Sequence, residues 1–147
     1  MNKNNPRQAW MSLLAKVPEH SLEDKLAAVG PEPEFKWLRH PELGGIMVQG
    51  RSGGTGGRFN IGEMTVTRCA LQLDTGEVGH AVVQGRSKSK ARHAALVDAL
   101  MQTAQAGNLK ARILDPLTAE MAASQETRAA KAAATKVDFF TMVRGED

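Results

Sequence analysis

The apolar positions of the first thirty residues recur at helical spacing. Trp10, Leu13, Leu14 and Val17 follow Asn5-Pro6 and precede Pro18, which predicts a short helix with proline in its first turn. A second short helix is predicted from Ser21 to Gly30-Pro31. The period then changes to two, and residues 34–39 predict a strand that ends where His40-Pro41 turns the chain.

Alternating patterns predict three further strands, at about residues 45–51, 62–73 and 77–86. Asp74-Thr75-Gly76 joins the last two, so an antiparallel meander is expected. Alternation predicts one hydrophobic face and one mixed face. The hydrophobic face is expected to carry Ile46, Val48, Cys69, Leu71, Leu73, Ala81 and Val83.

The sequence Val-Gln-Gly-Arg-Ser occurs twice, at Val48–Ser52 and at Val83–Ser87. In a meander, the two strand ends would lie at one edge of the sheet and bring together arginines and a glycine loop. Loop N–H groups beside arginines can hold a phosphate or a carboxylate, whereas the alternative is a hairpin loop with tight backbone packing. The candidate anion-binding or interface residues are Arg51, Ser52, Gly53, Gly54, Thr55, Gly56, Arg58, Arg68 and Arg86.

Two helices are predicted after the sheet. The first is capped by Ser87 or Ser89, presents Lys88 and Lys90 to solvent, and runs to about Ala104 before Gly107-Asn108. The last begins at Asp115-Pro116, is rich in alanine and offers little anchoring area until its apolar end. That end, residues 137–147, is interpreted as a partner-docking tail, or alternatively as a segment that folds back onto the sheet; its apolar residues are Val137, Phe139, Phe140, Met142 and Val143.

Taken together, the 147 residues predict a single α+β domain. The formal net charge of +3 is compatible with phosphate-bearing partners. Because Cys69 is the only cysteine, no intrachain disulfide can form, and the histidines lack metal-ligand spacing. No catalytic set emerges, no bound cofactor is expected, and the absence of a signal peptide or membrane span predicts a cytoplasmic protein.

Five segments resemble the G subunit of the bacterial carbon–phosphorus lyase core complex, and they follow one another along most of the chain. The C-terminal nine-residue segment is the most specific of them. They are Gly53-Gly54-Thr55-Gly56 with Arg58-Phe59, Thr65-Val66-Thr67-Arg68, Val83-Gln84-Gly85-Arg86, Asp98-Ala99-Leu100-Met101-Gln102, and Val137-Asp138-Phe139-Phe140-Thr141-Met142-Val143-Arg144-Gly145.

The resemblance implies a cytoplasmic hetero-oligomer of G, H, I and J subunits. In that family the G, H, I and L proteins convert ATP and methylphosphonate to ribose 1-methylphosphonate 5-triphosphate and release adenine. The nucleosidase chemistry is attributed to I and the radical cleavage to J, so this chain is expected to be structural or accessory, with ATP a substrate of the complex. The alternative is a stand-alone RNA-binding module using the basic sheet edge, although surface aromatics that stack bases are lacking.

Overall fold

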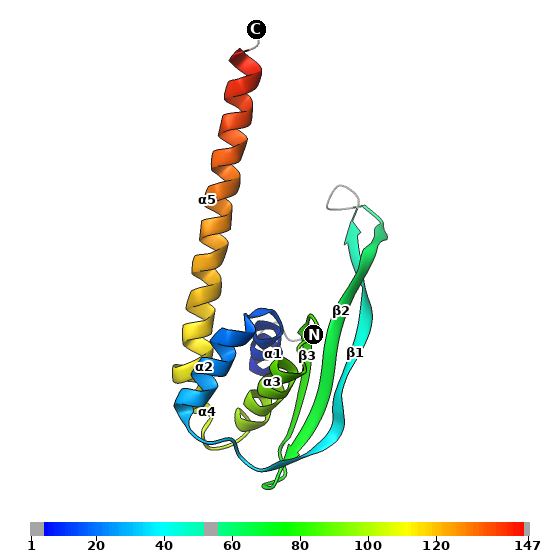
Figure 1. Cartoon of the computed structure of the whole chain (residues 1–147), viewed down its shortest axis with the longest axis vertical. Coiled ribbons are helices and arrows are strands. Elements are labelled where there is room, and N and C mark those ends of the chain that lie inside the picture. The colour runs from blue at the N-terminus through cyan, green and yellow to red at the C-terminus, as the bar shows by residue number, and fades with distance from the viewer. Residues whose placement is uncertain (1–4, 52–55, 146–147) are drawn as a thin grey trace.

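The computed structural model describes residues 5–51 and 56–145, and it describes the side chains of these except at 51, 58, 60 and 135–145. The elements, in chain order, are α1 (Pro6–Lys16), α2 (Glu19–Val29), β1 (Phe35–Arg51), β2 (Arg58–Leu73), β3 (Val78–Gln84), α3 (Lys88–Leu100), α4 (Ala106–Leu109), a π-helical turn (Lys110–Leu114) and α5 (Asp115–Gly145). The helices lie on one side of the sheet, and α5 and the β1–β2 hairpin extend from the body (Figure 1). The predicted α+β class is confirmed.

The two N-terminal helices differ in how closely they follow the prediction. In α1 the Asn5 side chain accepts a hydrogen bond from the Arg7 amide at 3.1 Å, with Pro6 as the first helical residue. The predicted start of α2 at Ser21 is wrong, because the helix begins at Glu19 directly after an extended Pro18. Glu19 favours that start because a carboxylate in the first turn complements the helix dipole. Ser21 is instead a buried residue within α2.

The predicted turn at His40-Pro41 is also wrong, since β1 runs through both residues. Register shifts at Trp37/Arg39 and Arg39/Glu42 let the strand bend there without ending. β1 is an edge strand of the β1-β2-β3 sheet. An edge strand tolerates a proline because the missing N–H need not face another strand. The two predicted strands at 34–39 and 45–51 are therefore one.

The sheet is an antiparallel meander whose central strand is β2. Gly76, at φ 107°, closes the β2–β3 hairpin, and its amide donates to the Leu73 carbonyl at 2.8 Å. Cys69 pairs with Ala81, and both face α3 in the hydrophobic core. The core combines that sheet face with α3 and with apolar residues from the N-terminal helices, the π-helical turn and the start of α5, including Leu14, Leu22, Leu71, Leu96, Ile113 and Leu117.

The helix after the sheet is shorter than predicted. α3 ends at Leu100, and a turn that includes Thr103 follows before Gly107-Asn108, which lie inside α4 and not at a helix end. The hydroxyl of Thr103 donates to the Leu100 carbonyl at 2.6 Å and satisfies an acceptor at the helix end. Among the described helices, none has the length and apolarity needed to span a membrane.

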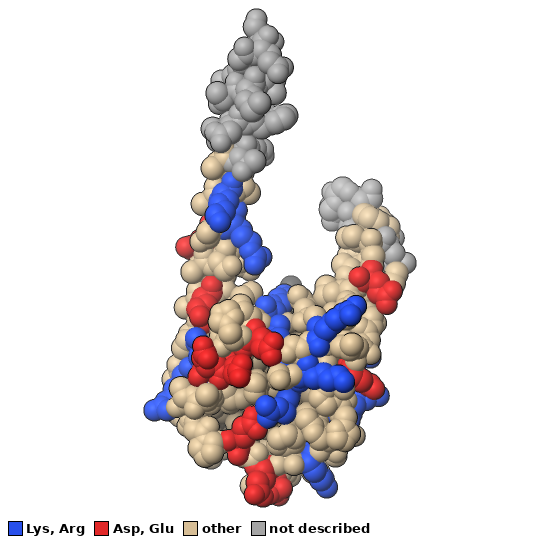
Figure 2. All heavy atoms as spheres, in the orientation of Figure 1, with Lys and Arg blue, Asp and Glu red and all other residues tan. Residues whose placement is uncertain are grey.

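Two parts of the chain extend beyond this core. Because β3 pairs only with the Val66–Gln72 part of β2, residues 45–51 and 58–65 form a two-stranded ribbon. α5 packs chiefly against the π-helical turn at its base and then leaves the body. The described atoms of the ribbon and of α5 stand apart from each other (Figure 2).

Candidate functional site

The two copies of the repeat do not converge. Arg51 pairs with Arg58 at the end of β1, whereas Gln84 at the end of β3 pairs with Val66. Eight residues of β2 separate these two levels, which corresponds to about 26 Å along an extended strand. The expectation that both strand ends lie together at one edge is therefore wrong. In the observed register, β3 pairs with the part of β2 that is far from Arg58. The predicted strand order does not determine this register.

The copies also differ in backbone conformation. Gly50 lies within β1 opposite Phe59, so the first copy continues as a strand to Arg51. Gly85 takes φ 94° and ends the second copy's strand, after which Ser87 accepts a hydrogen bond from the Lys90 amide at 3.0 Å and caps α3. Ser87, and not Ser89, is the cap.

The predicted faces of the first copy need the same correction. Ile46 pairs with Met64 and Val48 with Gly62, which alternation along β2 places on the face of Arg68 and not on that of Cys69. The register shifts before Glu42 and the bulge at Val48/Gln49 reset which face each residue of β1 occupies.

The glycine loop connects β1 to β2 at the end of the ribbon. Ser52, Gly53, Gly54 and Thr55 lie outside the described residues, as do the side chains of Arg51 and Arg58. Gly56 is half-buried, and Arg86 is an exposed residue directly after the positive-φ Gly85. An anion site in the loop stays a prediction, but it is a site separate from Arg86.

Lys90 is buried, which corrects the expectation of a solvated lysine. Its Nζ donates to the Ala15 carbonyl at 3.2 Å, in the last turn of α1. Burial lowers the pKa of Lys90, and the charge of Glu19 opposes that shift. The amine provides a hydrogen bond to a carbonyl at the negative end of the α1 dipole, and it therefore has a structural role at this position.

Arg68 lies on the face of the sheet that points away from α3. We call this surface the open face, and its centre consists of Glu42, Gly44, Val66, Arg68, Val82 and Gln84. The guanidinium lies over Gly44, where Nη2 is 3.5 Å from the position that an added Cβ would take. Its Nε is buried and has no hydrogen-bond partner among the described residues.

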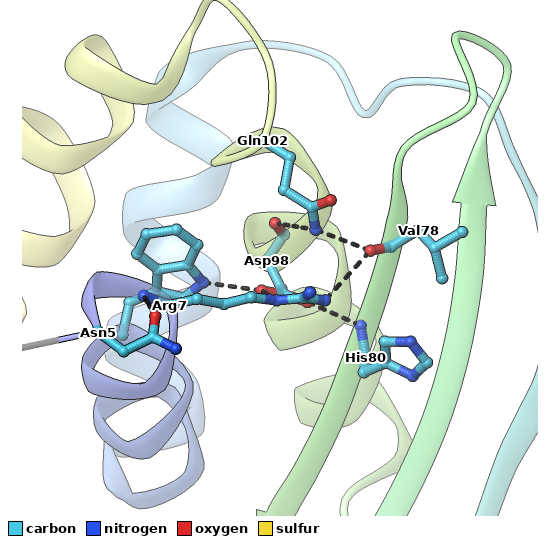
Figure 3. A network of polar contacts seen from close by, with 7 residues as sticks. Asn5, Arg7, Val78, His80, Asp98 and Gln102 are labelled. Atoms are coloured by element: carbon cyan, nitrogen blue, oxygen red, sulfur yellow. Dashed lines mark hydrogen bonds and ion pairs between the residues drawn. The ribbon is translucent and has the colours of Figure 1, made fainter. Parts of the chain in front are cut away.

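A polar network centred on Asp98 joins α1, β3 and α3 (Figure 3). The fully buried carboxylate accepts hydrogen bonds from Arg7 Nε at 3.2 Å and Nη2 at 3.0 Å, from Trp10 Nε1 at 2.8 Å and from the His80 amide at 2.9 Å. Gln102 Nε2 donates to the Val78 carbonyl at 2.8 Å. Every oxygen of Asp98 is satisfied within the fold, so the network is structural.

Sequence reasoning did not find this network. Asp98 and Gln102 are the two polar residues of the segment 98–102, and these two were used only for the resemblance. The available signal was a lone aspartate inside an otherwise apolar helical stretch, since a carboxylate in such a position requires partners.

Cys69 is unsuited to act as a nucleophile. Its Sγ lies 3.2 Å from the Ala91 carbonyl, and burial raises the pKa of the thiol to about 11. Among the described residues, no three or more His, Cys, Asp and Glu side chains are grouped so as to hold a metal ion.

His93 is buried beside an ion pair at the start of α3. Its Nε2 lies 3.3 Å from Arg92 Nη2 and 3.7 Å from Glu32 Oε1. Burial and the charge of Arg92 lower the pKa of His93, and nearby carboxylates, with Glu32 first, oppose the shift. Its Nδ1 has no hydrogen-bond partner among the described residues.

The five apolar residues of the predicted docking tail, Val137, Phe139, Phe140, Met142 and Val143, belong to α5. Their side chains lie outside the described part of the chain, so their docking role stays a prediction.

Comparison with known proteins identifies a matching family profile and a similar named relative. The profile of the family described as "Phosphonate metabolism protein PhnG" matches residues 5–145. A relative from Rhizobium meliloti (strain 1021), named alpha-D-ribose 1-methylphosphonate 5-triphosphate synthase subunit PhnG, is 43% identical over 141 residues. The alignment covers 96% of this chain and 90% of the relative.

Proposed function

The chain belongs to the family of the phosphonate metabolism protein PhnG, and from this membership we propose that it is an accessory, assembly-forming subunit of a ribose 1-methylphosphonate 5-triphosphate synthase. The complex would act in the cytoplasm and transfer methylphosphonate to the ribose C1 of ATP with release of adenine. ATP would be a substrate of the complex, and this chain would bind no cofactor of its own. The proposed partners are the H, I and J subunits, with L for the transferase step.

The structural observation that best supports this proposal is the ribbon, whose large apolar side chains are left exposed to solvent. Ile46 is 39% exposed, Met47 55%, Phe59 50% and Ile61 64%. A two-stranded ribbon is marginal in water unless another surface covers it, and clustered exposed apolar side chains are typical of interaction sites. A subunit interface would supply that cover.

Side chains over the ribbon's glycines add to the argument. A Cβ at Gly50 would come within 2.7 Å of Ile61 Cδ1 and 3.3 Å of Phe59 Cζ. Both apolar side chains therefore lie across the backbone of β1 and form one patch. A patch on a projecting ribbon can enter a groove of another protein, as donated strands and hairpins do.

Three buried polar groups are compatible with the proposed accessory role. Asp98 is saturated by hydrogen bonds, Lys90 is bonded to Ala15, and the thiol of Cys69 is protonated at neutral pH. General acid–base or nucleophilic catalysis requires a group that is accessible and has a suitable pKa. None of these three groups meets both conditions.

The test is co-expression of the chain with the H, I and L subunits and measurement of ribose 1-methylphosphonate 5-triphosphate formed from ATP and methylphosphonate. We expect product only when this chain is present, co-purification with the other subunits, and no turnover by the chain alone. Turnover by the isolated chain would refute the accessory role. Salt-dependent RNA binding by the isolated chain, with no co-purification, would favour the RNA-binding alternative.

Deletion of residues 137–147 tests the tail within the same experiment. If the tail docks on another subunit, the truncated chain keeps the thermal transition of the full chain but no longer co-purifies. A truncated chain that unfolds by itself would show that the tail completes this domain's own core.

A further inference from the structure

The open face combines exposed apolar side chains with buried ones that the main core does not contain. Ile46 is 39% exposed and Val82 is 47% exposed, on the two strands that flank β2. Between them, Val66 is 2% and Ala70 is 8% exposed, yet neither belongs to the core cluster that α3 covers. The sheet therefore has a second apolar surface, on the side opposite the helices.

Arg68, at the centre of this surface, has an incomplete set of hydrogen bonds. Glu42 is its cross-strand neighbour, but that carboxylate pairs with Arg39 at 3.3 Å. The Nε of Arg68 is buried and has no acceptor among the described residues. A guanidinium donor that has lost water without gaining an acceptor is unfavourable, and a carboxylate that pairs with the guanidinium would offset this cost.

We infer that the open face is the docking surface for a carboxylate-bearing surface of another subunit of the synthase, with Arg68 as its central anchor. The inference rests on the proposed function and adds the surface and the chemistry of its partner. The strands present Lys36, Arg39 and Arg68 on this face against Glu42 alone, so its charge complements an acidic partner. Arginine surrounded by apolar side chains is a common energetic centre of protein interfaces.

A protein carboxylate fits this position better than a free phosphate. A phosphate is stabilised by several convergent donors, such as loop N–H groups or neighbouring cations. Around Arg68, Gly44, Val66 and Val82 offer no side-chain donor, Glu42 is an acceptor, and Gln84 supplies a single neutral amide. The backbone N–H groups of β2 serve the ladders to both flanking strands. A carboxylate on an apolar protein surface would match both the charge and the apolar neighbours.

The test uses the full chain co-expressed with tagged synthase subunits. Arg68→Glu, Arg68→Met and Val82→Asp should each reduce the affinity for the partner by about 30-fold or more, because a desolvated charge pair or its apolar surround is lost. Arg112→Glu is the matched control: Arg112 is exposed in the π-helical turn, on the helical side of the molecule. It should assemble like the unaltered chain. All four variants should keep the thermal transition of the isolated chain.

Normal co-purification of both Arg68 variants would overturn the inference while leaving the proposed function intact. Failure of the unaltered chain to co-purify would overturn the proposed function itself. If the isolated chain binds ATP or methylphosphonate, and Arg68→Met weakens that binding while assembly is unchanged, the open face holds a ligand and the inference is wrong.

Discussion

Asp98→Ala should destabilise the chain strongly, because this carboxylate accepts hydrogen bonds from three groups on α1 and β3. It accepts from Arg7, from Trp10 Nε1 and from the backbone amide of His80. Among the described residues, only Arg7 of the three donors has a second acceptor, the Val78 carbonyl at 3.5 Å. Removing it leaves the Trp10 and His80 donors without partners in a partly buried environment. Each unsatisfied buried donor costs about 1–3 kcal/mol. Arg7 adds less, because its side chain is 41% exposed and can be rehydrated.

The expected loss in the free energy of unfolding is therefore about 4 kcal/mol. Urea denaturation followed by far-UV circular dichroism measures this loss. An unchanged m value would show that the unaltered chain and Asp98→Ala expose the same surface on unfolding. For a domain of this size, the same loss lowers Tm by roughly 10 °C. Arg7→Ala should cost clearly less than Asp98→Ala, because water can enter from the exposed side and the other two donors remain.

Asp24→Ala serves as the control, since Asp24 is an exposed residue of α2 and its loss should change stability by no more than about 0.5 kcal/mol. The reasoning fails if Asp98→Ala costs less than about 1 kcal/mol, or if Arg7→Ala is as damaging. Either result would mean that solvent satisfies the Trp10 and His80 donors without the carboxylate.

Three further predictions concern the core and its ionisable groups. Gly79→Ala should lower the free energy of unfolding, measured by urea denaturation, by about 3 kcal/mol, because its Cβ would collide with the Ala95 carbonyl. Gly62→Ala is the control and should be close to neutral, because a Cβ there meets no atom within 4 Å. Equal losses for the two variants would contradict the packing argument. The thiol of Cys69, with its pKa at about 11, should react with a thiol reagent only in denaturant, so rapid labelling of the native chain would contradict its burial. Folding lowers the pKa of His93 from 6.5, so as the pH falls the unfolded chain binds the proton first, and the free energy of unfolding should decrease below about pH 6.5. His93→Gln should flatten this pH dependence between about pH 7 and 5. An equal slope in the unaltered chain and the variant would assign the dependence to other groups.

Local patterns predicted most of the fold because the corresponding elements are set by local chemistry. Asn5-Pro6 caps α1, and Gly76 closes the second hairpin, as the sequence indicated. The strand through Pro41 could not be predicted in the same way. Proline normally ends a strand, and only the edge position of β1 and the register shifts around Pro41 make it tolerable. Edge position is a property of the assembled sheet.

The candidate site shows the same limit at the level of individual side chains. Lys90 has the sequence context of a solvated lysine in a first helical turn. It is buried because α1 places the Ala15 carbonyl within reach of its amine. The importance of Asp98 likewise depends on donors from α1 and β3, which are distant in sequence. Hydrophobic periodicity fixes which face of an element is apolar, but it does not show which polar group of another element will meet it.

The repeated Val-Gln-Gly-Arg-Ser sequence shows why identical local sequence does not give one shared site. Its first copy is part of the ribbon, where β2 continues the ladder opposite Gly50. Its second copy has no such ladder beyond Gln84, and there the chain turns at Gly85 into α3. The glycine is extended in one copy and at positive φ in the other, because tertiary pairing decides which of its accessible conformations is used. Since about 26 Å of β2 lies between the two levels, an anion or carboxylate held at one copy is out of reach of the other. Arg51, at the end of the ribbon, and Arg86, beside the start of α3, therefore cannot share one ligand.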